Sequence, residues 1–170
     1  MPNMLSVIIF AYFAIAMTIL SVLVITRKNP IHSVLFMMAL FFHIAALYLF
    51  LNAEFLAAVQ VVLYAGAILV LFLFVITMLN LKWEVAYEPF IEEWPISLAV
   101  GLSLLLLVFF TTMNFVKGPI GQYSIEAIKS ETNTKILGKV LYTEYLFPFE
   151  IASLILLIAI VGAMVLAKKK

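Results

Sequence analysis

Two polar side chains with helical spacing interrupt a long apolar stretch, and they are the first candidates for chemistry in this sequence. Gln60 and Tyr64 stand four residues apart, so they share one face of an α-helix. Such a pair can hold water or pass protons as a polar relay. It can equally serve only to join two neighbouring helices, which is what most polar side chains in membrane spans do. The spacing alone leaves both interpretations open.

Three small residues, Ala65-Gly66-Ala67, directly follow Tyr64. Glycine lacks a Cβ and is about 1 kcal/mol less favourable than alanine inside a helix. A π-bulge or a kink forms at such a weak place, and π-bulges gather at functional sites. Small residues also permit close packing of two helices, so the pattern is compatible with a gate or with a contact.

Three further ionisable side chains lie in or beside apolar runs. His43 stands alone within one run, which is more typical of a neutral hydrogen-bonding residue than of a ligand, although it stays a relay candidate. Glu54 begins a run, where a carboxylate suits the positive end of a helix dipole. An ionisable residue near a membrane is also a functional candidate, so Glu54 is kept as one. Glu150 stands in the same kind of position at the start of the last run.

The composition indicates an integral membrane protein and excludes several kinds of site. The sequence is 66% hydrophobic and 11% charged, whereas a soluble domain is nearer half apolar and a quarter charged. A net charge of +1 provides no basic surface for nucleic acid. With no cysteine and only two separated histidines, the chain offers neither thiolate ligands for an iron–sulfur cluster nor a metal site. We therefore expect any redox centre to lie in partner subunits.

The apolar runs predict an all-α fold with five transmembrane helices in a single membrane domain, because about 20 apolar residues cross a bilayer. The first run is too long for a signal peptide and is expected to be retained. A connection over residues 81–93 carries four glutamates, and an aqueous loop is expected over 117–145. Within that loop, Asn133 or Thr134 is expected to cap a short helix that ends at Thr143. The predicted spans are residues 4–26, 31–51, 54–79, 94–116 and 146–167.

The cations predict the orientation of these spans, since cytoplasmic loops carry an excess of lysine and arginine. With the N-terminus outside and the C-terminus inside, the outer side holds Lys117, Lys129, Lys135 and Lys139. The inner side then holds Arg27, Lys28, Lys82 and Lys168 to Lys170.

Three stretches resemble subunit J of the proton-translocating NADH:quinone oxidoreductases (respiratory complex I) and its counterpart, the sixth mitochondrially encoded NADH dehydrogenase subunit. They are residues 27–33 (RKNPIHS), 53–75 (AEFLAAVQVVLYAGAILVLFLFV) and 137–154 (LGKVLYTEYLFPFEIASL). The tyrosine-glycine segment and the Pro-Phe-Glu segment are the most specific. Together with five spans in the same order, the resemblance covers nearly the whole chain.

The resemblance implies a non-catalytic subunit of a translocase in a bacterial inner (cell) membrane. It implies contacts with the subunits lettered A, H and K and with the antiporter-like pumps, while NADH, FMN, iron–sulfur clusters and quinone belong to partner subunits. In this family the third span can carry a π-bulge, and rewinding of the bulge is proposed to gate a water path that couples quinone reduction to proton translocation. The matching residues are Tyr64, Ala65, Gly66, Ala67 and Ile68.

One departure from the family and two alternatives bear on this interpretation. Some relatives have a glutamate where this chain has Gln60, and an amide cannot titrate, so a proton-carrying role at that position is unsupported. The chain could instead be the equivalent subunit of a membrane hydrogenase, of a ferredoxin- or F420-dependent oxidoreductase, or of a cation/proton antiporter complex. It could also be a stand-alone small transporter or a purely structural assembly subunit.

Overall fold

All elements that the structure describes are helices joined by turns. The computed structural model describes residues 4–79, 94–113, 128 and 130–168, and these residues contain no strand. Five helical segments are long and apolar enough to cross a membrane: Met4–Thr26, Pro30–Phe50, Glu54–Met78, Trp94–Met113 and Leu146–Ala167. The all-helical prediction with five candidate membrane spans is therefore confirmed. Residues 114–116 of the predicted fourth span, the connection over 81–93 and most of 117–129 lie outside the described residues.

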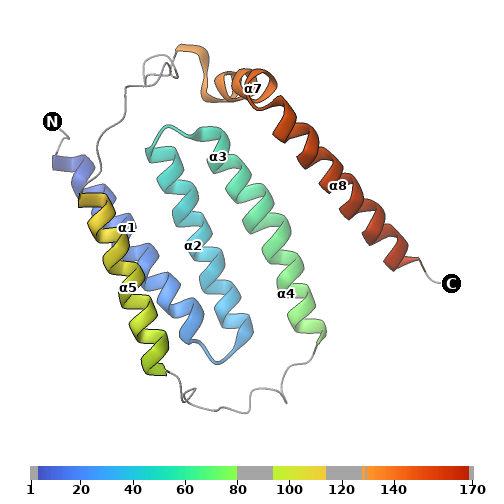
Figure 1. Cartoon of the computed structure of the whole chain (residues 1–170). Coiled ribbons are helices and arrows are strands. Elements are labelled where there is room, and N and C mark those ends of the chain that lie inside the picture. The colour runs from blue at the N-terminus through green and yellow to red at the C-terminus, as the bar shows by residue number, and fades with distance from the viewer. Residues whose placement is uncertain (1–3, 80–93, 114–127, 129, 169–170) are drawn as a thin grey trace.

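Three spans pack into one layer, in which the second span lies between the other two (Figure 1). The first is α1 (Met4–Thr26) and the second is α2 (Pro30–Phe50). The third consists of α3 (Glu54–Val59), the π-helical segment η1 (Gln60–Ile68) and α4 (Leu69–Met78). Because α2 contacts α1 as well as all three parts of the third span, its small or branched side chains Val34 and Ala45 are buried.

The turns at the two ends of α2 follow from local sequence. At the start, Asn29 is the N-cap: its side-chain oxygen accepts a hydrogen bond from the Ile31 N–H at 2.9 Å, and Pro30 occupies the first turn. At the other end Asn52 adopts a left-handed φ of 59°, which asparagine tolerates better than most residues. The Ala53 N–H then donates to the Tyr48 carbonyl at 2.8 Å. This tight turn makes α2 and α3 antiparallel neighbours.

The remaining helices are α5 (Trp94–Met113), α7 (Asn133–Thr143) and α8 (Leu146–Ala167). α7 packs against α3 and α8, and its Ile136 is buried. The short helix is thus confirmed, but the predicted cap is wrong: Thr132 takes the N-cap position without a side-chain hydrogen bond, and Asn133 lies inside the helix. The positive φ of Thr132, 72°, turns its backbone away from the conformation that ordinary capping residues adopt.

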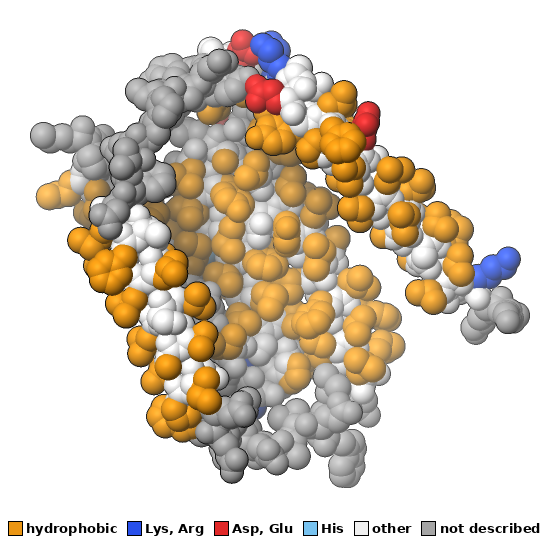
Figure 2. Space-filling view, in the orientation of Figure 1, with side chains coloured by type: hydrophobic (Ala, Val, Ile, Leu, Met, Phe, Trp, Pro, Cys, Tyr) orange, Lys and Arg blue, Asp and Glu red, His pale blue; other side chains and the backbone are white. Residues whose placement is uncertain are grey.

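All residues of α5 and α8 are exposed within this chain. Hydrophobic side chains cover both helices, and most of the charged groups in view lie near α7 and at the end of α8 (Figure 2). An apolar surface of this extent marks contact with lipid or with other proteins. Together with the five candidate spans, it identifies a multi-pass membrane protein.

Candidate functional site in the third span

The third span changes its hydrogen-bonding pattern in its first half. The Gln60 N–H donates to the carbonyl of Leu56, four residues back, as in an α-helix. The Leu69 N–H donates to the carbonyl of Tyr64, five residues back, as in a π-helix. The π segment is nine residues long, Gln60–Ile68, so the predicted π-bulge in the third span is confirmed and it begins four residues before Tyr64. Such segments are rare and occur frequently at functional sites.

The π winding decides which side chains of the third span are buried. The buried residues are Ala57, Gln60, Ala65 and Leu69. In a regular α-helix, residues five apart point about 140° away from each other, because each residue turns the helix by about 100°. Gln60 and Ala65 therefore could not both be buried against one neighbour in that winding. A turn closed over five residues brings them into line, and this places the small Ala65 where a four-residue step would place Tyr64.

Gly66 lies within the π segment at a position where a side chain would be tight. An ideal Cβ built on Gly66 would be 3.3 Å from the carbonyl oxygen of Val61, five residues earlier. That contact is shorter than ordinary van der Waals contact, so any other residue would require a small shift of the backbone in this winding. By contrast, a Cβ on Gly101 or Gly162, in two other spans, meets no atom within 4 Å. Among these three glycines, only Gly66 lies where an added Cβ would come close to another atom of the chain.

Gln60 and Tyr64 occupy different environments. Gln60 is 7% exposed, whereas Tyr64 is 45% exposed, and no hydrogen bond joins their side chains among the bonds of the described residues. The Tyr64 ring instead packs edge-to-face on Phe41 of α2, with 5.8 Å between ring centroids and an interplanar angle of 83°. The phenol thus lies at the border of α2 and is partly exposed within this chain.

The relay candidate His43 lies on α2 and contacts side chains of α1. One ring nitrogen, Nδ1, donates to the Ala39 carbonyl at 2.8 Å, which leaves Nε2 of the neutral ring as an acceptor. The Tyr12 hydroxyl of α1 lies 3.4 Å from Nε2 and is placed to donate to it. Through these contacts His43 joins α1 to α2, and Phe13 adds an edge contact to its ring.

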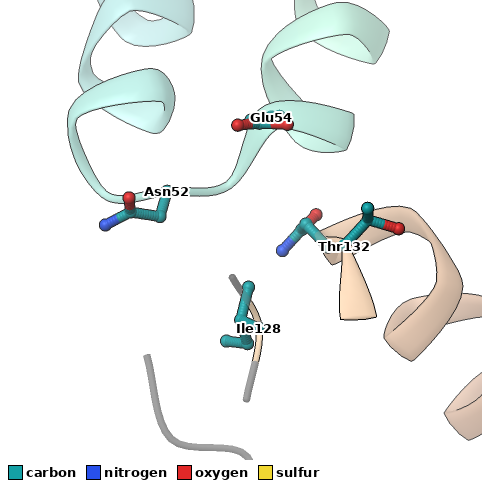
Figure 3. Close-up of a pocket in the computed structure, with 5 residues that line it drawn as sticks. Asn52, Glu54, Ile128 and Thr132 are labelled. Atoms are coloured by element: carbon teal, nitrogen blue, oxygen red, sulfur yellow. The ribbon is translucent and has the colours of Figure 1, made fainter. Parts of the chain in front are cut away.

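Glu54 lines a small polar pocket at the end of the third span (Figure 3). The pocket has a volume of about 140 Å³, and its lining consists of Asn52, Glu54, Ile128, Thr132 and Asn133. The side-chain oxygen of Asn133 is buried there without a hydrogen-bond partner in the described structure. A water molecule could satisfy this oxygen, since such sites are polar and have room for one. No group of three His, Cys, Asp or Glu side chains in the described part is arranged to hold a metal ion.

Comparison with known proteins assigns the family. The model of the family described as NADH-ubiquinone/plastoquinone oxidoreductase chain 6 matches residues 20–166. The chain belongs to this family. Among its relatives, the NADH-ubiquinone oxidoreductase chain 6 of Marchantia polymorpha is 38% identical over 96% of this chain and 87% of its own length. The NADH-quinone oxidoreductase subunit J of Rickettsia felis is 37% identical over 96% of this chain and 80% of its own length.

For this member of the family, the structure adds partners that sequence reasoning missed. Phe41, Tyr12 and Thr132 were not singled out, although each touches or neighbours a predicted site residue. Aromatic residues are frequent in all five spans, so nothing in the sequence distinguishes Phe41 or Tyr12 from residues that face lipid. The positive φ of Thr132 has no sequence signal either, because β-branched residues rarely adopt it.

Proposed function

We propose that this chain is a membrane-arm subunit of a proton-translocating NADH:quinone oxidoreductase and that it helps to couple quinone reduction to proton movement. It would not itself catalyse electron transfer. Support comes from the family match over residues 20–166 and from relatives named as subunits of this oxidoreductase. The five exposed, apolar spans fit a protein that is covered by neighbours and lipid. By analogy with the family, those neighbours are the subunits lettered A, H and K and the antiporter-like pumps.

The coupling element that we propose is the π segment, acting as a two-state helix. The observation that carries this proposal is the buried face formed by Gln60, Ala65 and Leu69, which requires π winding. If the segment rewound to an α-helix from Gln60 onward, Tyr64 would turn toward α2 and Ala65 would turn away. The large phenol of Tyr64 would then replace the methyl group of Ala65 at the contact with α2. The part of the third span that follows Tyr64 would rotate about the helix axis. Such a change can open or close a water path beside α2, which is the gating role proposed for residues 64–68.

The polar side chains along this path have different proposed roles. Gln60 can order water but cannot titrate, so it would position a proton path without carrying the proton. Tyr64 would move between two environments as the winding changes, and Glu54 would connect the end of the span to water. His43 would hold α1 to α2 rather than act in the relay, because both of its ring nitrogens are already engaged.

We also propose the orientation and location of the chain. The N-terminus would be outside and the C-terminus inside a bacterial inner membrane, and residues 1–170 would form one membrane domain with an outer aqueous loop over 117–145. The packing of α7 against α3 fits a loop on the same side as the end of the third span that holds Glu54, and the distribution of lysine and arginine is the ground for taking that side as the outer one. FMN, iron–sulfur clusters, NADH and quinone would be bound by partner subunits, because this sequence has no cysteine to hold a cluster.

Two experiments test the proposal in turn. Purification of the tagged chain in mild detergent is expected to recover a large complex that contains flavin and iron–sulfur clusters; a small oligomer of this chain alone would refute the assignment and favour a transporter. Structures of the intact complex at rest and during turnover are expected to show residues 60–68 in both windings. If every state shows the same winding and no water near Gly66, the gating role is wrong while the subunit assignment stands.

A further inference from the structure

A hollow of about 260 Å³ lies at the turn between α1 and α2, separate from the π segment and from the Glu54 pocket. It is lined by Arg27, His32, Leu35 and Phe36. Two of these side chains carry N–H donors and two are apolar. The lining of the hollow therefore combines polar donors with apolar side chains.

The guanidinium of Arg27 lies over the ring of Phe36, 5.0 Å from its centroid, which is a cation–π distance. Stacking covers one face of the planar guanidinium and leaves the N–H groups at its edge for hydrogen bonds. Among the described residues, Lys135 forms an ion pair with Glu131. No described carboxylate forms an ion pair with Arg27. The first turn of α2 is already capped by Asn29, so the donors at this hollow come from side chains.

The depth of the hollow indicates what it meets. Thr26 ends one membrane-spanning helix and Pro30 begins the next, so the turn between them lies at the level of the lipid headgroups. Leu35, one turn further along α2, is 48% exposed and extends the apolar part of the lining toward the bilayer interior. Donors at headgroup level above apolar side chains match a phospholipid, with phosphate oxygens above and acyl carbons below.

We propose that this hollow binds the headgroup of an anionic phospholipid, with Arg27 and His32 donating to phosphate oxygens and Leu35 and Phe36 contacting the upper acyl chain. An anionic lipid is preferred over a zwitterionic one because a choline group would bring a positive charge against Arg27. Basic residues next to a span attract anionic lipid in general. Here the stacked ring would also hold the cation in place. The inference does not depend on the gating role of the third span.

The test uses the full chain reconstituted into phosphatidylcholine vesicles that contain a photoactivatable phosphatidylglycerol or, in parallel, a photoactivatable phosphatidylcholine. Cross-links within residues 27–36 are quantified by mass spectrometry. The wild-type chain is expected to cross-link the phosphatidylglycerol several times more efficiently. Arg27→Gln is expected to reduce that yield about fivefold, the effect of one basic residue near the surface, and to leave the phosphatidylcholine yield unchanged. Arg27→Lys, which keeps the charge but loses the planar stack, should fall between the two.

Lys168→Gln is the matched control, because it removes one positive charge at another helix end that has no ring beneath it among the described residues, and it should leave these cross-links unchanged. Equal yields from the two lipids in the wild-type chain would overturn the proposal. An equal loss for both lipids in Arg27→Gln would also overturn it, because it would show that Arg27 shapes the turn for any lipid and does not select the anionic headgroup. Displacement by excess inorganic phosphate would show a site for a free anion and would overturn the lipid assignment.

Discussion

Gly66→Ala adds one methyl group inside the π segment and tests whether the winding of this segment matters. The new Cβ would be 3.3 Å from the Val61 carbonyl oxygen, so the neighbouring backbone must yield slightly. In a regular α-helix alanine is the most favourable residue, and the five-residue turn that creates this contact is absent. The substitution therefore disfavours the π winding relative to the α winding.

The expected size of the bias follows from that contact. Mild overpacking costs about 1 kcal/mol at the low end of measured cases, which changes the ratio of the two windings about fivefold. If turnover requires both windings, proton pumping and NADH:quinone reduction should fall together, by up to about fivefold. Alanine is preferred to leucine here because Gly66 is exposed within this chain, and a leucine side chain would also meet neighbouring subunits.

The assay compares membrane vesicles from strains that carry the variant and its control. Rates of pumping and quinone reduction are divided by the amount of assembled complex, measured as NADH oxidation by an artificial acceptor. Gly162→Ala is the control, since it brings the same gain in helix propensity in another span and its Cβ meets nothing within 4 Å. Wild-type rates in assembled Gly66→Ala complex would refute the two-state reasoning and leave Gly66 with a packing role only.

Three further substitutions probe other contacts. Gln60→Leu should keep the thermal midpoint of the assembled complex, because an apolar side chain of similar size can fill this buried position, yet it should lower the pumping rate; a lower midpoint would show that a neighbouring subunit bonds the amide. Tyr12→Phe should cost about 0.6 kcal/mol of stability, as interhelical hydrogen bonds in membranes do on average, and leave activity unchanged; loss of pumping in the assembled complex would place His43 in the relay. Asn29→Ala should lower the stability of the purified chain by about 1 kcal/mol through loss of the helix cap, measured by thermal unfolding followed by circular dichroism. Asn29→Asp, which retains a capping oxygen, should not; equal losses in both variants would contradict the capping role.

Much of the fold could be predicted from the sequence because membrane spans are defined locally. An apolar run of sufficient length must be helical in lipid, where each backbone polar group needs an internal partner. The first and last helices, Met4–Thr26 and Leu146–Ala167, accordingly begin and end where hydrophobicity predicted. The tight turn at Asn52 was also readable, because two spans were separated by only two residues.

The site was predictable only in part. Ala65-Gly66-Ala67 indicated a weak place in the helix, but the sequence could not distinguish a π-bulge from a packing contact without the family resemblance. The extension of the π segment back to Gln60 had no local signal, since it depends on which side chains face α2. The different environments of Gln60 and Tyr64 have the same cause. A spacing of four residues places two side chains on one face of an α-helix, but in this segment the turn closes over five residues.

Sequence alone therefore determined the number of spans, their approximate ends, the absence of cysteine ligands and the position of the weak segment, since each of these depends on residue type or on neighbours along the chain. Tertiary structure decided that Ala65 rather than Tyr64 is buried with Gln60, that Tyr12 reaches His43, and that Arg27 lies over Phe36. These features depend on the rotation of one helix against another. That rotation is set by the packing of whole faces, which no short stretch of sequence specifies.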